Sequence, residues 1–476
     1  MKTVNTEKRN QVWAFLIMGH LILFSILYYQ ANAYYMYLIA YIWFGVAYGM
    51  MLQYGRFCFA SASRDLFAAG VPRMAVGIII ALIFFSIIQA ILSATKLSTF
   101  HPAPMGIHTI IGGFIFGIGM VLAGGCASGS LYKCGEGNGT SMLVIAGICF
   151  GQAIFVDLGG IFDKLVPQSW AQAAAAKNLP VDISGWYDQY LAGHVWDHPT
   201  ITIARTEFMS GIFPGTMKYL IGNSVIHTIL PALLLLVAIY FLVSRKGFIR
   251  KRRKEKGHIG FKDELAGIWS MVTASKRTSL MGLLIGITAG IHILTIKGMQ
   301  LKFGIDNFGQ LLTRMGHTGD VSVTGKIFDP GYWYITSQEA QLGAWILEKF
   351  GWDMHDNVFF GIINGIPEPW RNPALWMSLC IILGAMILAL LNREFGFKRP
   401  KGSAWLLGLS GGLLMGFGSR IALGCNIGGF FIRVAGGDPN GWMFFIGMIA
   451  SAFIVVKIIS WQIDRKMDKE MATLEL

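Results

Sequence analysis

The sequence contains ten apolar runs of about 17–21 residues each, and these runs limit the possible folds more than any other feature. A helix of about 20 apolar residues is long enough to span the hydrocarbon core of a bilayer. Charged residues make up only 14% of the chain, whereas soluble domains carry about 25%. A soluble enzyme and a disordered chain are therefore excluded, and we predict an all-α polytopic membrane protein. The predicted spans are residues 12–29, 35–53, 74–93, 107–125, 141–158, 225–244, 279–296, 374–391, 404–424 and 442–461.

The basic residues are distributed unevenly around these spans. If the N-terminus is cytoplasmic, the inner segments carry 25 of the 39 Lys and Arg residues, and the longer outer segments carry 12. The positive-inside rule describes such a bias. The basic run 250–254 also fits the rule, although a run of this kind suits anionic lipid or nucleic acid as well. We favour the topological interpretation, which places both termini in the cytoplasm and predicts no nucleic-acid partner.

One glycine pattern occurs twice in the chain. Gly112, Gly113, Gly117, Gly119, Gly125, Cys126 and Gly129 recur 299 residues later as Gly411, Gly412, Gly416, Gly418, Gly424, Cys425 and Gly428. In the predicted topology the two copies enter the membrane from opposite sides. We therefore predict a five-plus-five inverted repeat, which is a frequent plan among transporters. Alternatively the glycines serve close helix packing, and the two roles are compatible.

The repeat divides the chain into four segments. Residues 1–158 form the first five-helix repeat, and residues 159–224 form an outer, periplasmic loop. Residues 225–462 form the second repeat, which includes a further outer loop at 297–373, and residues 463–476 form a cytoplasmic tail. Both outer loops are rich in tryptophan, which suits a cap over an outer vestibule or an interfacial belt.

Each copy of the glycine pattern leads into a Gly-Cys pair, Gly125-Cys126 in the first and Gly424-Cys425 in the second. A helix that breaks at such glycines turns inside the membrane, where non-helical backbone is tolerated only within protein or along a wet cavity. The helix that follows points its free N–H groups and the positive end of its dipole at that cavity. We predict two re-entrant turns, at each of which a small anion pauses beside a thiol.

The remaining cysteines differ in their surroundings. Cys149 and Cys380 lie inside apolar spans and are expected to be small buried hydrophobes. Cys58 occupies a polar break between the second and third spans, and Cys134 follows Lys133 after the first turn. No pair has C-x-x-C spacing, and no His or carboxylate cluster accompanies the thiols. We predict no metal and no cofactor.

Arg420 is the conspicuous charge inside a span, five residues before Cys425. A buried cation suits either an anionic substrate or a structural partner such as Asp65, and the sequence does not choose between them. Thiols are weak hydrogen-bond donors, and sulfur is soft and polarizable. A path with thiols, helix N-termini and one arginine therefore favours a soft, sulfur-bearing anion over a sugar or a carboxylate.

Three motifs resemble the signatures of the YeeE/YedE family of sulfur transporters. They are GRFCFASASRD at 55–65, LAGGCASG at 122–129 and GFGSRIALGCNI at 416–427. The resemblance covers roughly residues 40–155 and 275–460 and implies a bacterial inner-membrane protein with an hourglass-like inverted repeat. It also implies import of thiosulfate. Both Gly-Cys motifs are close to the YedE branch of the family, which implies a selenium compound as the alternative substrate.

The same resemblance implies roles for single residues. Cys58, Cys126 and Cys425 would each donate an S–H hydrogen bond to the ion and pass it on without a covalent bond. The other predicted path residues are Gly125, Gly424, Ser128, Asn426 and Arg420, and the accessory ones are Cys134, Lys133, Arg64 and Asp65. By resemblance alone, a cytoplasmic sulfurtransferase-like protein is a partner. Lys133, Cys134 and the two long outer loops depart from the family pattern.

Two other classes of function compete with transport. A membrane thiol-redox or sulfur-transfer enzyme would form persulfides or disulfides on these cysteines. A structural or assembly subunit would need no reactive thiol. The ATP-binding pattern G-x4-G-K-[ST] is absent from the sequence, so the chain is not itself an ATPase. We predict a transporter and not an enzyme.

Overall fold

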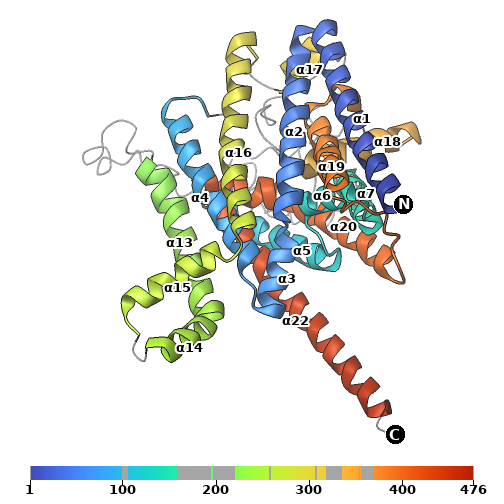
Figure 1. The fold of residues 1–476 in the computed structure, drawn as a ribbon. Coiled ribbons are helices and arrows are strands. Elements are labelled where there is room, and N and C mark those ends of the chain that lie inside the picture. The colour runs from blue at the N-terminus through green and yellow to red at the C-terminus, as the bar shows by residue number, and fades with distance from the viewer. Residues whose placement is uncertain are drawn as a thin grey trace, which may run out of the picture.

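The computed structural model describes residues 2–98, 105–157, 195–196, 220–256, 259–305, 308–317, 335–352, 354 and 368–474. The described chain is a bundle of long helices joined by short turns (Figure 1). Its first part contains α1 (Lys2–Ala31), η1 (Ala33–Tyr35), α2 (Met36–Gly55), α3 (Phe59–Ala69), α4 (Arg73–Ala94), β1 (Met105–Gly106), α5 (Ile107–Leu122), α6 (Ala127–Gly135), α7 (Gly139–Asp157) and β2 (Val195–Trp196), and β1 pairs with β2. Its second part contains η3 (Leu220–Ile229), α13 (Leu230–Ile239), η4 (Tyr240–Ser244), α14 (Arg245–Lys256), α15 (Phe261–Thr273), α16 (Lys276–Phe303), α17 (Phe308–Arg314), α18 (Ile335–Lys349), η7 (Pro369–Arg371), α19 (Pro373–Leu391), α20 (Ala404–Ile421), η8 (Asn426–Phe431), α21 (Ile432–Ala435) and α22 (Asn440–Leu474).

The predicted class, an all-α polytopic membrane protein, is confirmed. Within the described ranges, nine helical segments are long and apolar enough to cross a bilayer, and they match nine of the ten predicted spans. The remaining predicted span, 141–158, lies on α7, whose apolar part Gly139–Phe155 is shorter. Most of the predicted outer loop 159–224 lies outside the described residues, whereas the loop 297–373 contains α17 and α18.

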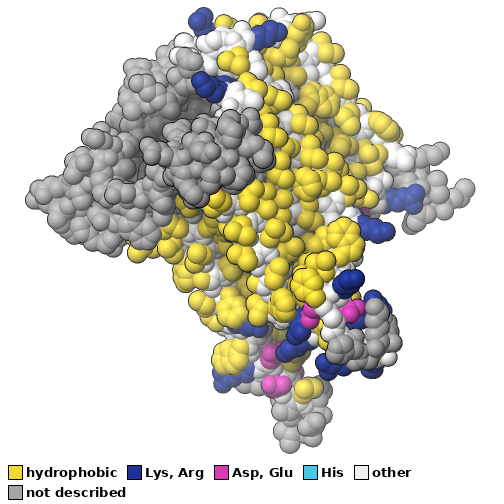
Figure 2. All heavy atoms as spheres, turned by 90° about the vertical axis from the view of Figure 1, so that its left-hand side faces the viewer, with side chains coloured by type: hydrophobic (Ala, Val, Ile, Leu, Met, Phe, Trp, Pro, Cys, Tyr) yellow, Lys and Arg dark blue, Asp and Glu magenta, His cyan; other side chains and the backbone are white. Residues whose placement is uncertain are grey.

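The surface agrees with a membrane location. Hydrophobic side chains cover the middle of the face in Figure 2, and basic side chains gather toward its lower end. The basic helix α14, the helix α15 and the C-terminal end of α22 lie at that same lower end in Figure 1. This is the arrangement that the positive-inside rule expects if the lower end faces the cytoplasm. The orientation itself stays a prediction.

The two halves of the chain pack on each other helix by helix. From the two halves, α2 packs along α19, α4 along α16, α5 along α22 and α7 along α20. At the centre, α5 and α20, which carry the two copies of the glycine pattern, pack directly on each other. An inverted five-plus-five repeat would produce this exchange of partners, and the repeat remains a prediction that the packing favours.

The matched glycines bring α5 and α20 into backbone contact. A methyl group added at Gly112 would lie 2.7 Å from the carbonyl oxygen of Gly418, and one added at Gly418 would lie 2.6 Å from that of Gly112. Gly119 and Gly411 are related in the same way, at 2.5 and 2.7 Å. Any larger side chain would push the two helices apart, so the packing role of the stripe is confirmed.

Candidate functional site

The two Gly-Cys turns follow α5 and α20 and have the same backbone conformation at two equivalent positions. Gly124 has φ +65° and Leu423, its counterpart 299 residues later, has φ +55°, so both turns pass through the left-handed region. Cys126 and Cys425 are then both extended, with φ −82° and −86°, and each begins a short helical segment, α6 and η8. Both cysteines are buried, as a re-entrant turn inside the membrane requires.

Cys58 and Cys126 place their thiols side by side. The two Sγ atoms are 3.7 Å apart, and both side chains are buried. Cys58 is held there because α2 ends at Gly55 and α3 begins directly after it, so the polar break of the sequence lies against the first turn. The backbone N–H of Gly129 donates a hydrogen bond to Cys126 Sγ at 3.3 Å, which fixes the thiol at the N-terminus of α6.

Polar contacts continue from Cys126 to the second turn. Cys126 Sγ lies 3.5 Å from Ser128 Oγ, and Asn426 Nδ2 donates to Ser128 Oγ at 3.5 Å. Asn426 follows Cys425, and the backbone of Thr336 on α18 lies near the Cys425 thiol. Four of the predicted path residues, Cys58, Cys126, Ser128 and Asn426, therefore form one unbroken line of contacts that ends beside Cys425.

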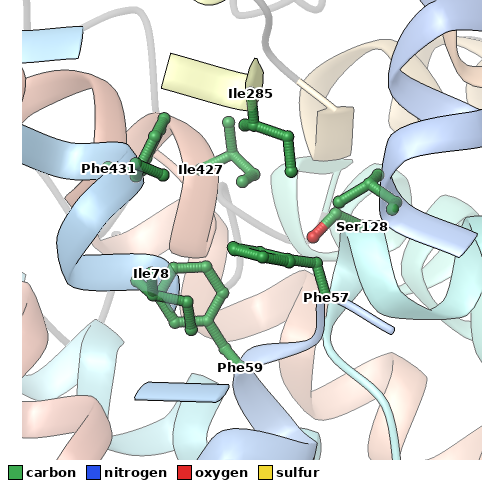
Figure 3. Close-up of a pocket in the computed structure, with 9 residues that line it drawn as sticks. Phe57, Phe59, Ile78, Ser128, Ile285, Ile427 and Phe431 are labelled. Atoms are coloured by element: carbon green, nitrogen blue, oxygen red, sulfur yellow. The ribbon is translucent and has the colours of Figure 1, made fainter. Parts of the chain in front are cut away.

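An apolar cavity adjoins this line (Figure 3). In Figure 3 the Ser128 side chain lies at its edge, among aromatic and aliphatic side chains from both halves. Apolar walls exclude water, and charge–dipole attractions are stronger in such surroundings than in water. A dry setting strengthens the hold of weak donors, such as thiols, on an anion. The lining residues are Leu52, Phe57, Phe59, Ile78, Ala81, Ser128, Ile285, Ile427 and Phe431.

A basic side chain from a helix that follows each turn donates a hydrogen bond to a carbonyl oxygen of that turn. Lys133 Nζ on α6 donates to the carbonyl oxygen of Gly124 at 2.7 Å. Arg433 Nη2 on α21 donates to the carbonyl oxygen of Leu423 at 3.1 Å, and Arg433 also pairs with Asp438 at 3.2 Å. Gly124 and Leu423 are equivalent positions, so the two turns are stabilised by the same interaction. This gives Lys133 a structural function that the sequence did not reveal.

An ion-pair cluster lies next to Cys58. Arg56, two residues before it, pairs with Glu136 at 2.5 Å and with Glu394 at 2.8 Å. Gln53 donates to both carboxylates as well. Burial raises the pKa of the Glu136 carboxyl, while the Arg56 guanidinium acts in the opposite direction. The cluster ties α2 to the end of α6 and to the segment that follows α19.

The other predicted residues lie apart from the line of contacts. Arg64 is 62% exposed and pairs with Asp65 at 2.9 Å. Arg420 is fully buried in α20, close to the second turn in sequence. Cys134 is buried on α6. All six cysteines are free thiols in the structure, and the described residues include no group of three His, Cys, Asp or Glu side chains able to hold a metal.

One buried acidic residue was not predicted from the sequence. Glu339 on α18 is only 2% exposed, although the sequence placed it in an outer loop. Helix α18 has 15 residues and is too short and too polar to be recognised as a span. The one available signal was the small residues Ala340, Gly343 and Ala344, whose spacing indicates a helix face that packs closely. A methyl group added at Gly343 would lie 2.4 Å from the carbonyl oxygen of Cys149 on α7.

Known proteins resemble this chain over most of its length. A family model described as sulphur transport matches residues 54–454. The chain belongs to this sulphur transport family. It is 26% identical over 419 residues to the thiosulfate transporter TsuA of Spirochaeta thermophila, which covers 87% of this chain and 97% of the relative.

Two further relatives are also named as transporters. The thiosulfate transporter TsuA of Escherichia coli K12 is 25% identical over 431 residues, with 89% of this chain and 94% of the relative covered. The probable transporter YedE of Salmonella typhimurium is 36% identical over 129 residues, which is 27% of this chain and 31% of the relative. The predicted family is confirmed, and this member of the sulphur transport family is a multi-pass membrane transporter and not an enzyme.

Proposed function

We propose that this protein imports thiosulfate, or a closely related sulfur-bearing anion, across a bacterial inner membrane through a path lined by thiols. The likeness to the two TsuA transporters over most of the chain supports the substrate class. The single observation that carries the proposal is the contact of Cys58 Sγ with Cys126 Sγ at 3.7 Å, where two buried breaks between helices of the first half meet.

In this proposal the ion moves along neighbouring hydrogen-bond donors. It would enter at Cys425 and Asn426, pass Ser128 and Cys126, and leave from Cys58 toward the cytoplasm. Each step is short because Asn426 contacts Ser128, and Ser128 contacts Cys126. Thiols bind an anion weakly, so no position retains it, and no covalent bond forms. Arg420, which is buried on α20, is the predicted positive charge for the anion.

A selenium compound is the second candidate substrate. The resemblance of both Gly-Cys motifs to the YedE branch and the soft character of the thiols support it. A cytoplasmic sulfurtransferase-like protein would remove the product, since the sequence lacks an ATP-binding motif of its own.

We expect cells that lack other importers to accumulate labelled thiosulfate only when they express this protein. An excess of unlabelled sulfate should leave the uptake unchanged, because sulfate has the same charge but no terminal sulfur for the thiols. Uptake is measured by filtration and scintillation counting, with an empty vector as the control. Uptake no greater than that of the vector would contradict the proposal, and competition by selenosulfate would identify the selenium compound as a further substrate.

Gly129→Ala tests the contact between the thiols. The new methyl group would lie 2.4 Å from Cys58 Sγ and 3.1 Å from Cys126 Sγ, so the Cys58 side chain must move away from the path. Loss of one hydrogen bond to a charged group predicts about tenfold slower uptake. Gly298→Ala is the matched control, since this helical glycine has open space around it. Equal uptake by both variants would contradict the assigned path.

A further inference from the structure

We propose that Glu339 binds a proton and couples the entry of the anion to the entry of that proton, which makes this protein a proton–anion symporter. The inference rests on the proposed function, because it concerns the same path. It adds the energy source of transport, about which the sequence is silent. The acid lies on α18, a helix that the sequence assigned to an outer loop.

Helix α18 is built into the transport site and does not merely cover it. It packs along α7 and contacts α19, α20 and α6, so both halves of the chain surround it. Gly343 lets α18 approach the backbone of α7 at Cys149. At its N-terminal end, the backbone of Thr336 lies near the thiol of Cys425. Glu339 follows Thr336 by three residues, which places it less than one helical turn further along α18 from the residue that lies near Cys425.

Glu339 is a buried carboxyl group for which the described part of the chain offers no hydrogen-bond partner. Its side chain is 2% exposed, and among the described residues neither carboxylate oxygen has a hydrogen-bond partner. Asp438 offers the contrast, because it is equally buried but pairs with Arg433. An isolated buried charge is costly, so a carboxyl in this position takes up a proton instead. Glu339 therefore holds a proton until its surroundings change.

Among the described residues, the titratable groups on which Glu339 acts electrostatically are thiols. Cys134 on α6, Cys149 on α7 and Cys425 in the second turn all interact electrostatically with Glu339. Of the other helices packed on α18, α19 carries Cys380 and α20 carries Arg420. The other charged residues near the end of α6 act elsewhere: Lys133 on Gly124, and Glu136 on Arg56. Burial is what raises the pKa of the Glu339 carboxyl, well above its usual range.

This arrangement links the proton to the anion. An ionised Glu339 would repel an anion that arrives at Cys425, whereas a protonated Glu339 presents no charge and can donate an O–H hydrogen bond. The anion in turn stabilises the protonated form. Because the linkage is reciprocal, each ligand raises the affinity for the other. The protein then carries both together, and the proton leaves Glu339 when the anion has moved on toward Cys58.

The test uses the purified full-length chain in liposomes, with thiosulfate as the probe and the membrane potential clamped at zero. Coupling to one proton predicts about tenfold greater accumulation of thiosulfate for each pH unit by which the lumen is made more alkaline. A luminal pH dye should report acidification that requires thiosulfate. The affinity for thiosulfate should fall as pH rises through the pKa of Glu339, because only the protonated form accepts the anion.

Glu339→Gln imitates the protonated acid permanently. This variant should still admit thiosulfate down its own gradient, but without response to the pH gradient and without acidification of the lumen. Glu348→Gln, the same change on the same helix, should keep the tenfold response. A structural role alone would slow the uptake of Glu339→Gln and leave that response intact, which overturns the inference.

Two further outcomes are decisive. Wild-type protein that admits thiosulfate but ignores the pH gradient overturns the coupling and leaves the proposed function standing. Wild-type protein that admits no thiosulfate under any gradient overturns both. If Glu339→Gln does not fold, Glu339→Asp takes its place: it keeps a titratable group, so coupling should persist with a displaced pH profile, and an unchanged profile would contradict the inference.

Discussion

Replacing Cys126 by alanine is expected to remove nearly all thiosulfate uptake. Cys126 is the junction of the path, since its thiol contacts Cys58 at 3.7 Å, Ser128 at 3.5 Å and the backbone N–H of Gly129 at 3.3 Å. Alanine removes the thiol, which is the hydrogen-bond donor between Ser128 and Cys58. A hydrogen bond to a charged group contributes about 1.5–3 kcal/mol, which corresponds to about 10- to 100-fold in rate or affinity. Initial rates of labelled uptake measure the loss.

Two variants make this result specific. Cys126→Ser keeps a donor of similar geometry but not the soft sulfur, so we expect uptake between that of the wild type and that of alanine. Cys380→Ala removes an equally buried thiol from α19, and we expect near-normal uptake from it. The amount of each variant in the membrane is compared by immunoblotting. Full uptake by Cys126→Ala would refute the thiol relay, whatever the substrate.

The sequence predicted those features that depend on order along the chain. The apolar runs predicted the spans because length and hydropathy decide whether a helix is stable in a bilayer. The constant offset of 299 residues pointed to Gly125-Cys126 and Gly424-Cys425, and both turns pass through the left-handed region just before the cysteine. The repeated glycines indicated close helix packing, because only small residues allow two helix backbones to touch, and Gly112 does pack on Gly418.

Features that depend on approach in three dimensions could not be predicted. Nothing in the sequence shows that Cys58 and Cys126, 68 residues apart, bring their thiols into contact. Lys133 was considered for the substrate, but its ammonium group holds the carbonyl oxygen of Gly124. Glu339 was overlooked because an acidic residue on a short helix normally indicates an exposed loop. Its burial results from contacts of α18 with four other helices, and these contacts have no local signature.

Asp65 illustrates an alternative that the sequence had left open. A buried Arg420 needed either an anion or a structural partner, and Asp65 was the candidate partner. The structure pairs Asp65 with its own neighbour Arg64 on α3, at 2.9 Å. Charge complementarity along a sequence therefore does not identify ion pairs, because the geometry of each helix decides which side chains meet. The predicted role of Arg420 toward the anion stays a prediction.

Arg433→Met is expected to cause the largest loss of stability. Arg433 joins α21 to the second turn through the carbonyl oxygen of Leu423, and it neutralises Asp438, which is fully buried. Removing one partner of a buried ion pair leaves an uncompensated charge, which typically costs about 3–5 kcal/mol. We expect a marked fall in the midpoint of thermal unfolding of the detergent-solubilised protein, with loss of uptake as a consequence.

Lys133→Met at the equivalent turn separates the charge effect from the loss of a hydrogen bond. Lys133 donates to the carbonyl oxygen of Gly124 but leaves no buried carboxylate behind, so the expected cost is only about 0.5–1.5 kcal/mol. The double variant Arg433→Met with Asp438→Asn removes both charges and should recover part of the stability. If Arg433→Met and Lys133→Met lowered the midpoint equally, the buried pair with Asp438 would contribute nothing beyond the contact with the turn. A partial recovery in the double variant would instead assign the difference between the two turns to the buried charge.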